Sequence, residues 1–113
     1  MLDNKINSKA GEVVLQFPTL HDTKHFLRVD HSEDDALIAS LLITSKTLVE
    51  EIIRYDLDNF YIVPEPINQA VLILTATLYE ERQISKSDKT GITLNDALID
   101  IKLMLFPYRN DKF

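Results

Sequence analysis

The stretch from Ser32 to Arg54 constrains the fold most, because it contains neither glycine nor proline and reads SEDDALIASLLITSKTLVEEIIR. The Ser32 hydroxyl can cap a first helical turn, and the three acids at 33–35 put negative charge at the positive end of the helix dipole. Apolar residues recur at helical spacing on one broad face, namely Leu37, Ile38, Leu41, Leu42, Leu48, Val49, Ile52 and Ile53. We therefore predict one long helix, from Ser32 to Arg54, that buries one side in a core.

Two other segments have the start signals of helices. Residues 19–29 begin with Thr19, and Asp22 stands at the third helical position, where it can complete a capping box. Residues 66–83 begin with Pro66, which suits a first helical position because its missing N–H would have no partner there. The second segment is apolar nearly all round, so we expect it to bury one face in its own bundle and another against a second protein.

A last helix is predicted over residues 94–106, with Thr93 as its cap, Asp96 in the capping pattern and Pro107 as its stop. The segment 55–63 mixes turn formers with aromatic residues and is predicted to be a short solvated connector with room for an extended piece. These elements predict an all-α fold, a small bundle of about four helices. Its expected core consists of Leu41, Leu48, Ile52, Val71, Leu74, Leu78, Leu98 and Ile101.

The chain divides into an amino-terminal arm at 1–18, a helical domain at 19–109 and a tail at 110–113. The arm contains VVLQF at Val13 to Phe17, a run of strand formers. An isolated strand has nothing of its own to pair with. Two placements therefore fit this run equally, one over the core of its own domain and one on a neighbouring subunit.

The net charge of −6 argues against a nonspecific grip on DNA, since such binding depends on lysines and arginines that neutralise phosphates. The acidity is concentrated at residues 33–58, which hold seven acids against two bases. The absence of cysteine excludes disulfides and thiolate metal sites. No apolar run approaches the roughly 18 residues of a membrane span, so we expect a soluble protein with no membrane partner.

The sequence contains one weak metal-binding pattern. His21 and His25 are four residues apart and would share a helix face, with Asp22 alongside and His31 a few residues on. Paired surface histidines are commoner than ligands, and neither an HExxH motif nor a phosphate-binding glycine loop is present. We therefore predict no metal site, no cofactor and no catalytic residues.

Three segments in order resemble the head-tail connector, or head completion, proteins of tailed bacteriophages, over residues 19–109. The turn at 27–30 matches as LRVD, the proline-led helix from Pro64 matches as PEPINQAVLILTATLYEER, and the end matches as PYR at 107–109. Many members have a longer, strand-rich insertion where this chain has only 55–63. The extension through Phe17 has no counterpart.

The resemblance implies a structural virion protein, made in the host cytoplasm and placed at the head-tail junction, and not an enzyme. Such proteins commonly form a ring of about twelve copies on the portal protein after DNA packaging. The ring would provide the attachment site for the next connector or tail component. DNA would pass through its lumen without sequence-specific binding.

Ala36, Ala39 and Ile43 form a narrow apolar stripe on the polar side of the long helix, between Lys46 and Glu50. We predict that this stripe contacts another protomer; the alternative is three exposed apolar residues, which are common on monomers. Its expected counterpart is the second face of the proline-led helix, represented by Leu72 and Tyr79.

Tyr108 and Arg109 follow the stop at Pro107 and are expected to serve assembly and not the fold, because termini are usually loose unless a partner holds them.

Two alternatives from other classes stay open at this point. Four short helices could include a helix-turn-helix of a DNA-binding regulator, although the acidity and the lack of a helix with clustered Arg and Lys oppose it. A small metal-dependent hydrolase built on His21 and His25 is the other.

Overall fold

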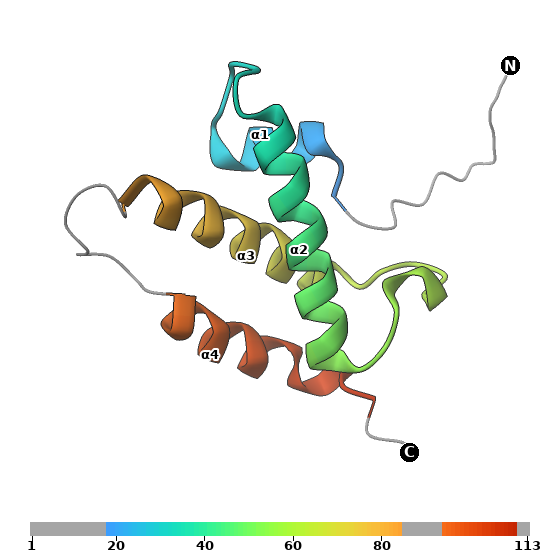
Figure 1. Cartoon of the computed structure of the whole chain (residues 1–113). Helices are drawn as coiled ribbons and strands as arrows, with labels where there is room; N and C mark the ends of the chain where they lie inside the picture. Colours follow the sequence, from blue (N-terminus) through green and yellow to red (C-terminus); the bar gives the residue numbers. More distant parts are fainter. Residues whose placement is uncertain (1–17, 85–93, 111–113) are drawn as a thin grey trace, which may run out of the picture.

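The computed structural model describes residues 18–84 and 94–110 of the chain. In these ranges it contains four α-helices, two short 3-10 helices and no strand, which confirms the predicted all-α class. Helices α3 and α4 run side by side in opposite directions, α2 crosses them, and α1 lies beside the start of α2 (Figure 1). The elements are α1 (Leu20–Leu27), α2 (Asp35–Ile53), η1 (Leu57–Asn59), α3 (Glu65–Ile84), α4 (Leu94–Leu105) and η2 (Phe106–Tyr108).

Helix α1 starts with the predicted capping box. The backbone N–H of Asp22 donates to the Thr19 hydroxyl at 3.0 Å, and the Asp22 carboxylate accepts the Thr19 backbone N–H at 3.1 Å. The bond from the Thr19 N–H favours the ionised carboxylate and so lowers the pKa of Asp22. The helix ends at Leu27, before the expected Val29, because Arg28 adopts the left-handed conformation at φ 61°.

The predicted N-cap of α2 at Ser32 is wrong by two residues. The helix begins at Asp35, and Ser32 closes a preceding turn by accepting the Asp35 N–H at its carbonyl, at 3.3 Å. The N-cap residue is Asp34, whose carboxylate makes no capping bond and accepts the Tyr79 hydroxyl at 2.6 Å. The far end agrees with the prediction, since Arg54 is the left-handed C-cap at φ 59°.

The core lies where α2, α3 and α4 meet. Of the eight predicted core residues, Val71, Leu74 and Ile101 are fully buried, whereas the other five are only half-buried. The buried residues of α2 are Ile38, Leu42, Ser45, Val49 and Ile53, and all but Ser45 lie on the predicted face. The complete buried cluster is Leu42, Val49, Ile53, Leu57, Val63, Ile67, Ala70, Val71, Leu74, Ile101 and Leu105.

The connector at 55–63 belongs to the core, which corrects its prediction as a solvated loop. Leu57 in η1 is fully buried, and Val63 is nearly so. The Glu50 carboxylate of α2 accepts the Leu57 backbone N–H at 2.8 Å and fixes the path of the chain. Its exposed large apolar residues are Tyr61 and Ile62.

Helix α3 starts one residue before its prediction, whereas α4 starts at Leu94 as predicted. Helix α3 begins one residue before Pro66, which still falls within the first turn, where no donor is needed. Thr93, the expected cap of α4, lies outside the described residues. The Leu94 N–H donates to the Glu81 carboxylate of α3 at 3.0 Å. Of the predicted arm, residues 1–17 are also outside the described ranges, and Pro18 is buried.

Replacing Leu74 by alanine should lower the free energy of unfolding by about 2 to 5 kcal/mol, because it removes a fully buried side chain and leaves a cavity. Urea denaturation followed by circular dichroism measures this change. Leu103→Ala is the matched control, since the Leu103 side chain on α4 is largely exposed, and it should cost less than about 0.5 kcal/mol. Equal losses from the two variants would contradict the described core.

Candidate interaction surfaces

The predicted stripe lies on the outside of α2. Ile43 is 62% exposed, Ala36 is exposed and Ala39 is half-buried. The Lys46 ammonium beside it lies 3.8 Å from the Glu50 carboxylate and 3.7 Å from that of Asp58. The stripe is therefore available to another chain, and its contact with a protomer stays a prediction.

The counterpart expected for the stripe is mostly covered within the protomer. Leu72 is only 9% exposed, and α1 packs against both α2 and α3. The Tyr79 hydroxyl donates to Asp34, and this bond to a carboxylate raises the pKa of Tyr79. The apolar second face of α3 is thus used by the chain itself, because α1 and the start of α2 lie on that side. A contact of Leu72 or Tyr79 with another chain stays a prediction.

The residues after Pro107 support the fold, which corrects the expectation that they serve assembly alone. Tyr108 is half-buried and packs against the core. The Asn110 backbone N–H donates at 2.7 Å to the Ile53 carbonyl, one of the last carbonyls of α2. Arg109 is exposed on the surface beside them. The part that Tyr108 and Arg109 play in assembly stays a prediction.

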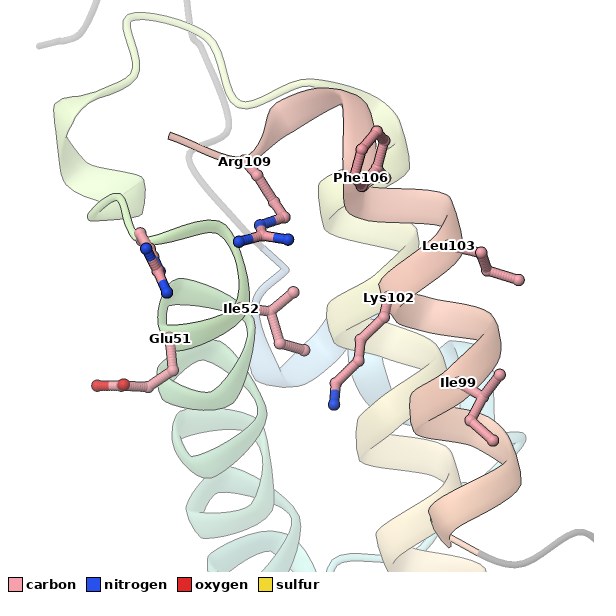
Figure 2. A pocket seen from close by; sticks show the side chains of 8 residues that line it. Glu51, Ile52, Ile99, Lys102, Leu103, Phe106 and Arg109 are labelled. Atoms are coloured by element: carbon pink, nitrogen blue, oxygen red, sulfur yellow. The ribbon is translucent and has the colours of Figure 1, made fainter. Parts of the chain in front are cut away.

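A second exposed surface, which we call the α2–α4 surface, was not predicted as a site. It is a groove of about 470 Å³ between the last turn of α2 and the outer side of α4. In Figure 2, Lys102 and Arg109 point into the space between the two helices, toward Ile52, whereas Ile99 and Leu103 extend from α4 on the side away from α2. Its lining residues are Glu51, Ile52, Arg54, Ile99, Lys102, Leu103, Phe106 and Arg109.

The α2–α4 surface combines exposed apolar side chains with positive charge. Ile99, Leu103 and Phe106 are 58%, 71% and 66% exposed, at the i, i+4, i+7 spacing of one helix face. Three basic residues and one acid line the groove, in a chain whose net charge is −6. The sequence contained a signal for this surface, because these three apolar residues are on the side of α4 opposite its buried residues Ala97, Ile101 and Leu105.

The histidine pair of α1 is exposed to solvent at His21 and His25. The Asp22 carboxylate, a possible third ligand, accepts the Thr19 N–H in the capping box. No group of three His, Cys, Asp or Glu side chains in the described ranges is placed to hold a metal ion. The structure therefore offers no support for a hydrolase built on these two histidines.

Comparison with known families gives one match. The model of the family described as phage gp6-like head-tail connector protein matches residues 17–109, which include the four α-helices of the described ranges. The chain belongs to the phage gp6-like head-tail connector family. The resemblance found in the sequence is thereby confirmed. No curated protein and no solved structure shows significant similarity to this connector.

Family membership gives the exposed surfaces a context. A head-tail connector is a structural component of the virion, and it contacts other components of the phage head and tail. The stripe and the α2–α4 surface are candidate sites for such contacts, because both present apolar side chains to solvent. Among the described helices of the connector, none is long and apolar enough to cross a bilayer.

Truncation of the connector after Pro107 should lower the free energy of unfolding by about 1 to 3 kcal/mol. The truncation removes the apolar contact of Tyr108 with the core and leaves the Ile53 carbonyl without the Asn110 N–H. Thermal and urea unfolding of the purified protein measure the loss. Truncation after Asn110 is the matched control, since it keeps both contacts and should melt as the full chain does. Identical melting of both truncations would show that these residues do not support the fold.

Proposed function

We propose that this connector forms a ring on the portal protein after DNA packaging, encloses the DNA channel and provides the attachment site for the next connector or tail component. The observation that supports the ring most is the presence of two separate exposed apolar surfaces on one protomer, the stripe around Ile43 and the α2–α4 surface. Each copy in a ring presents two different surfaces to its two neighbours. A protomer with two such surfaces suits this arrangement.

The charge of the chain supports a channel that DNA passes through without being held. A net charge of −6 repels phosphates, and exposed acids such as Glu33, Glu51 and Asp56 lie on or next to α2. Several other acids have structural partners, since Asp34 bonds Tyr79 and Glu81 bonds the start of α4. The acidic residues thus either have structural partners or repel DNA phosphates, and we assign none of them a catalytic role.

The connector should assemble when it is mixed with the portal protein of the same phage. Light scattering coupled to size exclusion should give the mass of the portal plus about twelve connector copies, the number common in such rings. The connector alone at high concentration is measured in parallel, because portal can act as a template for a ring that does not close by itself. A connector that stays monomeric and unbound under both conditions would refute the proposed ring.

A gel-shift assay separates the connector from a DNA-binding regulator. The connector should leave duplex DNA unshifted even at low salt, where phosphate contacts are strongest, because its net charge of −6 repels the phosphates. A basic DNA-binding protein on the same duplex is the positive control. A discrete, sequence-dependent shift at micromolar connector would favour the regulator instead.

A further inference from the structure

We propose that the α2–α4 surface of one copy receives the Ala36, Ala39 and Ile43 stripe of a second copy, so that the two exposed surfaces are the two halves of one contact. This inference rests on the proposed ring, and it specifies which surface meets which. It assigns the stripe a counterpart other than the second face of α3, where Leu72 is buried.

The α2–α4 surface requires a partner that is apolar in its middle and acidic at its edge. Ile52 is half-buried between the helices, and the exposed line of Ile99, Leu103 and Phe106 adjoins it. Lys102 is exposed, and the basic side chains around the groove outnumber the acidic ones. An apolar segment without acids would leave the exposed Lys102 ammonium facing desolvated surface, which costs free energy.

The stripe has the composition that this surface requires. Ile43 projects from α2 as its largest exposed apolar side chain, and the small side chains of Ala36 and Ala39 allow another helix to approach closely. Acidic residues before and at the start of α2 lie at the same end of the helix as Ala36 and Ala39. Asp34 and Asp35 already bond Tyr79 and Lys24, whereas Asp30 and Glu33 are exposed and can face the basic rim of a neighbour.

The positions of the two surfaces allow a repeating contact. The stripe lies in the first half of α2, and the groove uses its last residues, so Ile43 and Glu51 are about 12 Å apart along the axis at 1.5 Å per residue. The two surfaces are different patches, so one copy can use both at once. Contacts of this heterologous type close into a ring when the rotation between copies permits.

The amino-terminal arm is a weaker occupant of the groove on grounds of charge. Residues 1–17 hold two acids and two bases, and the apolar run at 13–17 holds neither. The arm therefore offers no net negative charge to the basic rim. The exposed pair Tyr61 and Ile62 of the segment 55–63 is another apolar candidate, and it is tested directly below.

Disulfide cross-linking tests the contact, because the chain has no cysteine of its own. The double variant Ile43→Cys with Leu103→Cys should give a ladder of disulfide-linked multimers when assembled rings are oxidised, since each copy would bridge to two neighbours. Each single variant gives at most a linked dimer and serves as the control. The pair Tyr61→Cys with Leu103→Cys should give no ladder. Melting curves of all variants should match wild type, because the three positions are exposed.

Charge reversal tests the same contact without cysteine. Glu33→Lys and Lys102→Glu should each weaken self-association by about tenfold or more, and the two changes together should restore it in part, because the charges exchange sides. The variant Δ1–17 should assemble as wild type does.

If wild type forms no ring, the proposed function fails. This inference is overturned, and the ring stands, if wild type forms rings and any one of three results is seen. These results are no ladder from the Ile43–Leu103 pair, a ladder from the Tyr61–Leu103 pair, or a failure of Δ1–17 to assemble.

Discussion

The burial of α3 between α2 and α4 is the constraint on which the rest of the structure depends. Ile67, Ala70, Val71 and Leu74 are all removed from solvent, and this apolar burial is the largest favourable contribution to folding in a domain of this size. Helix α1 packs on the outside of this arrangement, where its Lys24 ammonium lies 2.7 Å from the Asp35 carboxylate of α2. The Tyr79 hydroxyl of α3 donates to Asp34, the N-cap of α2. Helix α4 completes the core with Ile101 and Leu105. Each outer helix is therefore positioned by contacts that α2 and α3 provide.

Several helix ends are completed by side chains or backbone from other elements. Glu81 of α3 accepts the first N–H of α4, Glu50 of α2 accepts the N–H of Leu57, and Asn110 donates to the carbonyl of Ile53. The free N–H and C=O groups of helix ends cost free energy if they lack partners, so these long-range bonds join separate elements into one cooperative unit. They also give Glu50 and Glu81 structural partners that the sequence alone did not indicate.

Exposed apolar side chains connect the fold to the role of a head-tail connector. Ile43 on α2 and the Ile99, Leu103 and Phe106 line on α4 contribute little to the protomer, so selection for stability alone does not explain them. A structural phage protein that contacts other head and tail components has a use for such surfaces. The same helix can satisfy both demands because its buried and exposed faces carry different residues. In α4, Ala97, Ile101 and Leu105 face the core, and the exposed line faces outward.

The sequence by itself determined the helices, the Thr19–Asp22 capping box, the Arg54 end of α2 and the connector family, because capping and periodicity are local properties and the family pattern spans residues 17–109. It could not determine which of two apolar faces is buried. Leu72 and Tyr108 were assigned to interfaces, yet the first is buried and the second packs on the core. Similarly, Asp34 bonds Tyr79, a residue 45 positions away, and α2 starts after it instead of at Ser32. The physical reason is that helix crossing geometry and long-range hydrogen bonds select one face and one cap among several that local sequence permits, and only the tertiary structure brings those partners together.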